Sequence, residues 1–316
     1  MLLYTARPEF QVPSSTRAHH AAITLNRLND RNTRELVTGV VARGALAQEL
    51  VDAVVKRTDG VPLFAEELTR LILEGDGRSI AHEIPATLRD SLTARLDRLG
   101  PAKQVAQVAA VIGREFSYEL LQAVVRTSEG ELQSALKKLL DAERIYARGI
   151  APEATYQFKH ALIQDAAYEA LLRTRRKDLH QRVAQTITEK FATMAGEHPE
   201  VVARHWTKEG EAEPAIAAWR KAADAAFERH AFKEAEEAYR QTLTSLRTLP
   251  ESHDRDGREL ELMNRFAPVL QVTRGWAAPE AAEATAHALA LAEKSSNLAQ
   301  LVLQTVGSFC RRHQRW

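Results

Sequence analysis

A chain of 316 residues with 43 basic and 42 acidic side chains is long enough for two or three domains. The near balance of charge excludes a generally basic surface of the kind that binds nucleic acid, although it leaves room for a local basic patch. Cys310 is the only cysteine, which excludes an internal disulfide and a metal site made of cysteines alone.

Alanine, leucine, arginine and glutamate are frequent, and runs of β-branched residues are few, which predicts a mostly α-helical chain. No apolar run approaches the roughly 18–20 residues that span a bilayer, and the first residues, MLLYTARPEF, are too short an apolar stretch for a signal peptide. A single cysteine fits a reducing compartment, so we expect a cytoplasmic protein. The chain starts on a strand pattern and stops inside a helical one, so we expect a fragment of a longer protein.

The first predicted element is a buried strand at residues 2–5, which ends at Arg7 and Pro8. Ligands of parallel sheets bind at the carboxyl ends of strands, and a guanidinium suits a phosphate, so Arg7 is a candidate binding residue. The alternative is that Arg7 only covers the surface of a strand.

A second short strand is predicted over residues 19–28, with Ile23, Leu25 and Leu28 on its apolar side. Adjacent residues on an extended segment point to opposite faces, so we expect no metal site at His19 and His20.

Helices are predicted next over residues 29–41, 45–57 and 62–74, the first capped by Asn29 or Asp30. The third follows a turn at Asp59 and Gly60. It has Pro62 in its first turn, where the missing N–H costs nothing. Its predicted apolar face consists of Leu63, Phe64, Leu68, Leu71 and Ile72. Its predicted solvent side consists of Glu66, Glu67 and Arg70.

The string RTDGVPLFAEELTR resembles the STAND class of signalling ATPases, in the bacterial branch that carries tetratricopeptide repeats and is often fused to an adenylate or guanylate cyclase domain. Residues 60–63, GVPL, resemble the Gly-x-Pro-Leu motif of the helical lid, whose proline packs against the adenine. LLYTARPEF resembles the strand near the end of the ATPase core whose arginine senses phosphate. The resemblance implies an incomplete nucleotide site made of Arg7, Gly60 and Pro62. The alternative is a capped amphipathic helix without a ligand.

Residues 1–80 would then form the C-terminal part of an ATPase core and its lid. The chain contains no Gly-x-x-x-x-Gly-Lys-Ser/Thr run and no apolar strand ending in paired acids, which hold the phosphates and Mg²⁺ in this chemistry. We therefore expect no catalytic residue, no metal site and no ATP hydrolysis in this chain alone. ATP or ADP with Mg would be the cofactor of the full-length protein, with none tightly bound to this fragment.

Residues 84–195 predict a winged-helix-like module. Helices are expected over 85–99, 102–112 and 118–125, and Ser128 begins a fourth in a capping box with Glu131. Alternating residues at 144–148 and 155–160 then flank a turn, which predicts a β-hairpin, and a helix follows over 161–172. The string YQFKHALIQDAAYEALL also resembles the STAND-type ATPases, in which this module usually serves as a hinge and not as a DNA reader.

Two basic segments of this module are candidate DNA contacts. The fourth helix carries Lys137 and Lys138, but it also carries acidic residues. The stronger cluster consists of Arg173, Arg175, Arg176, Lys177 and Arg182. The alternative, a solvated helix surface, is the more common role of such a charge run. We therefore do not expect a nucleic-acid partner. His160 is expected to be a structural residue at a strand end, and neither it nor His180 lies in a metal-binding spacing.

Residues 198–316 predict helical hairpins. Helices are expected over 201–208, 213–229 and 232–246, and Trp219, Ala223, Ala235 and Tyr239 have the spacing of a tetratricopeptide repeat. Further helices are expected over 257–269, broken by Pro268, and over 279–293 and 298–312. The run TRGWAAPEAAEATAHALALAE again resembles the cyclase-linked ATPases. We expect an uncovered apolar edge at Leu301, Val302 and Phe309, and therefore protein partners or nucleotide-dependent self-association.

Three functions follow from these patterns. The first is a regulatory fragment of a STAND-type ATP-binding protein, which relays the nucleotide state to repeats and to a cyclase output domain. The second is an ATP-dependent transcriptional regulator of the same architecture. The third is a repeat scaffold for protein–protein interaction without a nucleotide role.

Overall fold

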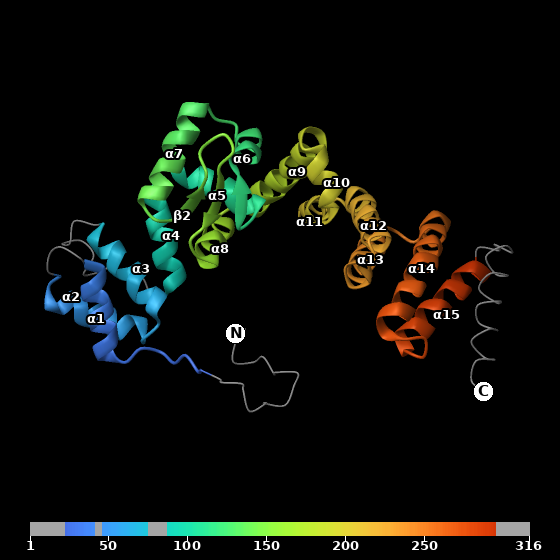
Figure 1. The fold of residues 1–316 in the computed structure, drawn as a ribbon, viewed down its shortest axis with the longest axis horizontal. Helices are drawn as coiled ribbons and strands as arrows, with labels where there is room; N and C mark the ends of the chain where they lie inside the picture. Colours follow the sequence, from blue (N-terminus) through green and yellow to red (C-terminus); the bar gives the residue numbers. More distant parts are fainter. Residues whose placement is uncertain (1–22, 42–45, 75–86, 295–316) are drawn as a thin grey trace. The chain divides into compact units, whose positions relative to one another are not determined.

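The protein is described by a computed structural model that places residues 23–41, 46–74 and 87–294 (Figure 1). These residues are mostly α-helical, with one small antiparallel sheet, which confirms the predicted fold class. The chain divides into two compact units, residues 1–91 and 92–316. None of the described helices is both long enough and apolar enough to cross a membrane.

The first unit contains α1 (Asp30–Val41), α2 (Gln48–Thr58) and α3 (Pro62–Leu73), close to the predicted ranges. Asn29 caps α1, because its side-chain oxygen accepts a hydrogen bond of 2.8 Å from the N–H of Asn32. Both α1 and α2 pack against α3. The predicted apolar positions of α3 are confirmed in Phe64, Leu68, Leu71 and Ile72, which are buried.

Two predictions for this unit are wrong. Residues 23–29 form no strand, and Ile23 and Leu25 are 81% and 90% exposed, because an alternating pattern makes a strand only where a partner strand lies beside it. Glu67 was expected in solvent but is 1% exposed, because two helices cover α3 and leave less open surface than a one-sided helix would have. The predicted strand at 2–5 and residues 19–22 lie outside the described residues, as does Arg7.

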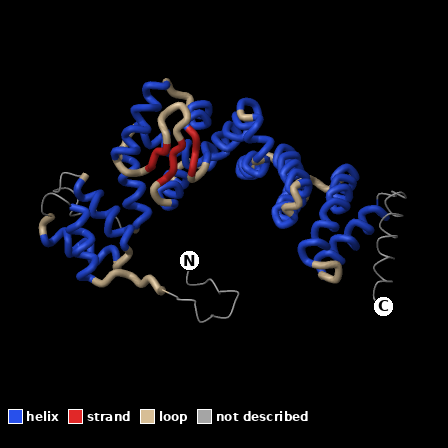
Figure 2. Tube along the Cα trace, viewed as in Figure 1, coloured by secondary structure: helices blue, strands red, loops and turns tan. Residues whose placement is uncertain are grey.

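The boundary between the two units falls within α4 (Leu88–Asp97), and the second unit continues with a helix–sheet module. Its elements are α5 (Pro101–Ile112), β1 (Glu115–Ser117), α6 (Tyr118–Val124), α7 (Glu129–Asp141), β2 (Ile145–Arg148), β3 (Thr155–Phe158) and α8 (Ala161–Glu169). The predicted hairpin is confirmed as β2 and β3. Strand β1 was not predicted, and it pairs with β3 to give the antiparallel order β1-β3-β2 (Figure 2). We call residues 101–169 the helix–sheet module.

The predicted capping box at the start of α7 is confirmed. The Glu131 carboxylate accepts a 3.0 Å hydrogen bond from the N–H of Ser128, and the Ser128 hydroxyl accepts one of 3.4 Å from the N–H of Glu131. Hydrogen bonds from Thr127 and Ser128 lower the pKa of Glu131 to about 2. The turn between α6 and α7 is therefore fixed by residues close together in the chain.

The rest of the second unit is helical. Its elements are α9 (Arg173–Lys190), α10 (Ala192–Glu197), α11 (Pro199–Glu209), α12 (Ala212–Glu228), α13 (Phe232–Leu246), α14 (His253–Arg274) and α15 (Pro279–Lys294). From α11 onward each helix packs against the next, as helical repeats do. We call α11–α15 the repeat helices. The predicted helix at 298–312 and its edge at Leu301, Val302 and Phe309 lie outside the described residues.

The predicted break at Pro268 is wrong, because α14 continues through it to Arg274. A proline inside a helix costs roughly 3 kcal/mol through the lost hydrogen bond and the ring's clash with the preceding turn. Here the proline itself is exposed, while Phe266, Ala267, Val269 and Leu270 around it are buried. Burial of these four side chains outweighs the cost of the ring.

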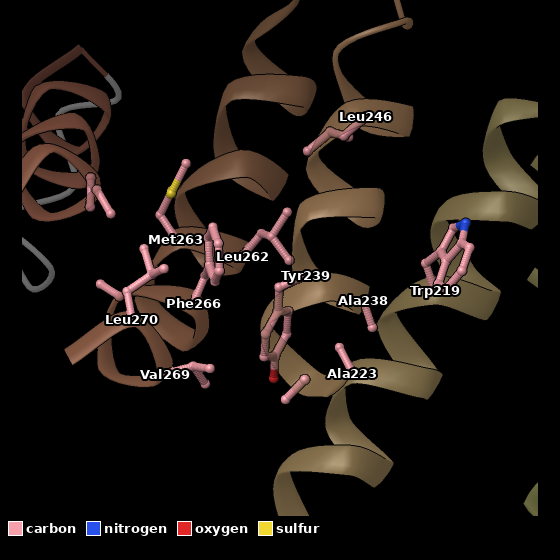
Figure 3. Close-up of a cluster of buried hydrophobic side chains, with 14 of the residues drawn as sticks. Trp219, Ala223, Ala238, Tyr239, Leu246, Leu262, Met263, Phe266, Val269 and Leu270 are labelled. Atoms are coloured by element: carbon pink, nitrogen blue, oxygen red, sulfur yellow. The ribbon is translucent and has the colours of Figure 1, made fainter. Parts of the chain in front are cut away.

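The core of the repeat helices is built on the predicted residues, since Trp219, Ala223, Ala235 and Tyr239 are all buried. Figure 3 shows Tyr239 of α13 beside Phe266 of α14, and their ring centres lie 5.9 Å apart. On the α11 side, the indole N–H of Trp219 donates a 2.8 Å hydrogen bond to the Thr207 hydroxyl. The two aromatic residues thus fill the spaces between successive helix pairs, and the alanines let the helices of a pair approach.

Candidate functional site

The two described residues of the predicted nucleotide site, Gly60 and Pro62, lie on the turn that leads into α3. Gly60 has φ of +69°, and a Cβ added to it would lie 2.1 Å from the carbonyl oxygen of Leu28. The N–H of Leu28 donates a 2.8 Å hydrogen bond to the Gly60 carbonyl. Only glycine allows this close approach of two backbone segments.

Pro62 is the first residue of α3, and its ring is exposed. The turn before it is held by a 2.9 Å hydrogen bond from the Val61 N–H to the Thr58 carbonyl and by an ion pair between Arg27 and Asp59. These two contacts hold the turn, and the exposed Pro62 ring on it is accessible to a ligand. Because Arg7 lies outside the described residues, the nucleotide site as a whole stays a prediction.

A second group of polar side chains lies where α8, α9 and α11 meet. The Nδ1 atoms of His180 and His205 are 2.8 Å apart, and the Tyr168 hydroxyl lies 2.9 Å from Nε2 of His180. Both histidines are buried. The group contains no third metal ligand of its own, and the described part of the chain contains no cluster of three or more His, Cys, Asp or Glu side chains able to hold a metal.

Burial lowers the pKa of His180 to about 4, and nearby Lys208 and Arg176 add to the effect. Burial also lowers the pKa of His205 to about 3, with a further contribution from His180 itself. Both imidazoles are therefore neutral at pH 7, and one N–H can serve the hydrogen bond between them. The sequence predicts no metal-ligand role for His180, and no local pattern predicts its pairing with His205, 25 residues away.

The predicted basic cluster at the start of α9 is only partly a solvated surface. The Arg173 and Lys177 side chains are exposed, and Arg175 is paired with Asp178 at 2.7 Å. Arg176 lies over the Tyr168 ring at 5.3 Å and Arg182 donates to the carbonyl of Val124, so both point into the protein.

The repeat helices form a groove of about 620 Å³ along α12, α13 and α14. Charged pairs cross from α12 to α14: Glu213 with Arg258 at 2.7 and 2.8 Å, Asp224 with Arg265 at 3.1 Å, and Arg220 with Glu261. A groove lined by both signs of charge over an apolar floor suits an extended peptide better than a nucleic acid.

Comparison with known proteins gives little further assignment. No family model matches the chain. The chain is similar to an uncharacterized protein of Rhizobium meliloti (strain 1021), with 26% identity over 285 residues. The match covers 87% of this chain and 28% of that protein, so the chain spans less than a third of the relative's length. The relative's name assigns no activity.

Proposed function

We propose that this chain is the regulatory part of a STAND-type ATP-binding signalling protein of the cytoplasm. Residues 1–80 contribute the lid and the end of the ATPase core, the module after it acts as a hinge, and the tetratricopeptide-like repeats bind a partner. ATP or ADP with Mg is bound by the full-length protein, and an adenylate or guanylate cyclase domain is the proposed output.

The observation that supports a relay is that α9 packs against both the helix–sheet module and the repeat helices. It packs against α5 and α6 of the helix–sheet module, where Arg182 donates to the Val124 carbonyl. It also packs against α11, where His180 meets His205. A helix held on both sides transmits a displacement of the module to the repeats, because packed interiors shift between discrete arrangements and do not deform smoothly.

The lid contributes the second support. The exposed ring of Pro62 stands on a turn that Gly60 fixes, as a residue that meets an adenine would need. The sequence resemblance gives that ring its role, and the geometry leaves it accessible.

The test uses the longer natural protein that contains this chain. Its ADP and ATP affinities are measured by calorimetry for the wild type, Pro62→Ala and a matched control, Pro279→Ala. Both prolines are exposed and start a helix, so loss of a helix-starting proline is the same in both variants. We expect about a tenfold weaker ADP affinity in Pro62→Ala alone, as the loss of one good contact gives.

The relay itself is tested by amide hydrogen exchange of α9 in the same protein with ADP and with ATP. The proposal expects the exchange rates of α9 and α11 to change between the two nucleotides. Unchanged exchange in both helices, with nucleotide bound, would contradict the relay. Equal ADP affinity in wild type and Pro62→Ala would contradict the lid.

A repeat scaffold without a nucleotide role is the second candidate, and the mixed-charge groove along α12 and α14 favours it. The two candidates differ in one measurement. A scaffold would bind its protein partner with the same affinity in the presence of ADP, of ATP and of neither.

A further inference from the structure

A cavity of about 740 Å³ lies between α5 and α7 of the helix–sheet module, the turn that joins α6 to α7, and α9. Its walls include four apolar side chains from two helices and a linker: Val105 and Val108 of α5, Leu179 of α9, and Leu171 in the segment between α8 and α9. A volume of this size lies within the range of roughly 300–1,000 Å³ that small-molecule sites occupy.

Four cationic side chains line the same cavity and come from three places in the chain. They are Arg126 in the turn, Lys138 on α7, and Arg175 and Arg182 on α9. The side chains of Arg126 and Lys138 have no hydrogen-bond or ion-pair partner among the described residues, and both residues are exposed. Arg175 is paired with Asp178, and Arg182 donates to the Val124 carbonyl.

The acidic side chains near the cavity do not balance these cations. Glu131 also lines it, but hydrogen bonds of 2.7 and 2.8 Å from the hydroxyls of Thr127 and Ser128 hold its carboxylate in the capping box. Asp178 is shared between Arg175 at 2.7 Å and Arg182 at 4.0 Å. Burial lowers the pKa of Arg182, and the positive charges of Arg126 and Arg175 add to this, so the cations repel one another. An anion placed among them would relieve that repulsion.

We propose that this cavity binds a phosphate-bearing organic molecule of about the size of a nucleotide. Guanidinium groups match the geometry of phosphate oxygens and ammonium adds a mobile charge, so Arg126, Arg175 and Lys138 take the phosphate. The apolar side chains at Val105, Val108 and Leu179 take the organic part. The site lies in the second unit, and the proposal does not depend on a nucleotide role for the lid.

Duplex DNA fits the same residues less well. DNA-binding helices usually lie with a convex face in the major groove. The exposed α7 residues that do not line the cavity are of both charges, since they include Glu129, Lys137 and Asp141. The cations of the cavity are instead gathered around a concave wall. DNA binding is therefore treated as an outcome of the test.

The test is calorimetric titration of the 316-residue chain with ADP and, separately, with inorganic pyrophosphate. We expect ADP to bind, pyrophosphate to bind more weakly because the apolar walls are left empty, and both affinities to fall with added salt. Lys138→Gln and Arg126→Gln each remove one charge without removing a protein contact, and each should weaken ADP about tenfold.

The matched control is Lys137→Gln, because Lys137 neighbours Lys138 on α7 but does not line the cavity, and it should leave ADP affinity unchanged. Pro62→Ala should also leave it unchanged, which separates this site from the lid. Circular dichroism of each variant verifies that the helices are kept.

Four results would overturn the proposal. The first is that neither ADP nor pyrophosphate binds at low salt. The second is that ADP binding is lost in Pro62→Ala and kept in Lys138→Gln, which would assign ADP binding to the lid. Equal affinities for ADP and pyrophosphate would indicate an anion site without an organic part. A higher affinity for duplex DNA than for ADP, reduced by Lys138→Gln, would indicate that these cations bind DNA.

Discussion

The helix–sheet module and the repeat helices are held together by different kinds of contact. In the module, β3 pairs with both β1 and β2 through backbone hydrogen bonds, and the capping box of Ser128 and Glu131 starts α7. In the repeat helices, polar side chains of one helix form hydrogen bonds with side chains of another. The clearest case is Glu236 of α13, which accepts hydrogen bonds from Arg274 and Thr273 of α14.

This difference determines how strongly the stability of each region depends on ionised side chains. Burial alone would raise the pKa of Glu236, but the hydrogen bonds from Arg274, Thr273 and Arg240 outweigh it and bring the pKa to about 2. Glu259 on α14 is likewise buried, with Arg247 and His287 as partners. The repeat helices therefore depend on ionised side chains inside their interface, while the sheet of the module depends on backbone hydrogen bonds that do not titrate.

The largest expected effect on stability comes from removing the buried indole of Trp219, which lies between α11 and α12. Trp219→Ala leaves a cavity and removes the hydrogen bond to Thr207, so it should lower the free energy of unfolding by about 3–5 kcal/mol. Urea denaturation followed by circular dichroism measures the loss. Trp276→Ala is the control, because this tryptophan is 65% exposed and should cost about 0.5 kcal/mol or less. Similar losses in both variants would contradict the proposed core.

Acid should next weaken the joint between the two regions. His180 and His205 have pKa values lowered by burial, so the unfolded chain takes up protons near pH 6.5 that the folded chain does not. Stability is therefore full above about pH 6.5 and falls as the pH decreases toward the folded-state pKa values. Between pH 7 and pH 5 the loss should be about 1–2 kcal/mol per histidine.

Thermal unfolding across this pH range measures the acid effect. His205→Gln removes one titrating group and should flatten the pH dependence. His198→Gln, at an exposed position, is the control variant. A wild-type melting temperature that does not change between pH 7 and pH 5 would show that the two imidazoles are not buried as described.

The carboxylate between α13 and α14 should have a smaller effect. Glu236→Gln keeps the shape but loses the charge that Arg240 and Arg274 share, so we expect a loss of about 2 kcal/mol. Both arginines are about half exposed and can turn to water, which limits the cost. Glu237→Gln is the matched control, because Glu237 is the next residue of α13 and is exposed. Equal chemical denaturation curves for the two variants would refute the role of Glu236.

The smallest expected effect tests the module. Ser128→Ala removes the hydroxyl that caps α7 and should lower stability by about 1 kcal/mol, with the same loss at low and at high salt. Ser134→Ala, inside the same helix, should cost nothing or stabilise slightly, because alanine is the better helix former. A loss in Ser134→Ala larger than that in Ser128→Ala would break the comparison.

Much of the fold could be predicted because its signals are local. The apolar residues of each helix recur within one or two turns, and caps such as Asn29 and Ser128 stand beside the helices they start. Strand β1 could not be predicted, because three residues are too few to show a period. The supposed strand at 19–28 had the right alternation, but in its described part no partner strand pairs with it.

The sites were less predictable than the helices. Gly60 was expected in a turn, and its positive φ agrees, but the approach of Leu28 to its carbonyl joins residues 32 positions apart. The meeting of His180 with His205, and of Arg182 with Val124, likewise joins distant segments. Such contacts are set by how helices pack, and no spacing within one helix reports them.

The double role of α9 has a practical consequence for dissecting this protein. A truncation that ends before residue 173 leaves the module without the helix that supplies Leu179 and Arg182 to it. A truncation that starts after residue 190 leaves α11 with His205 uncovered. Any expression of the two regions as separate pieces therefore needs residues 173–190 in both, and the intact pair should melt in one cooperative transition.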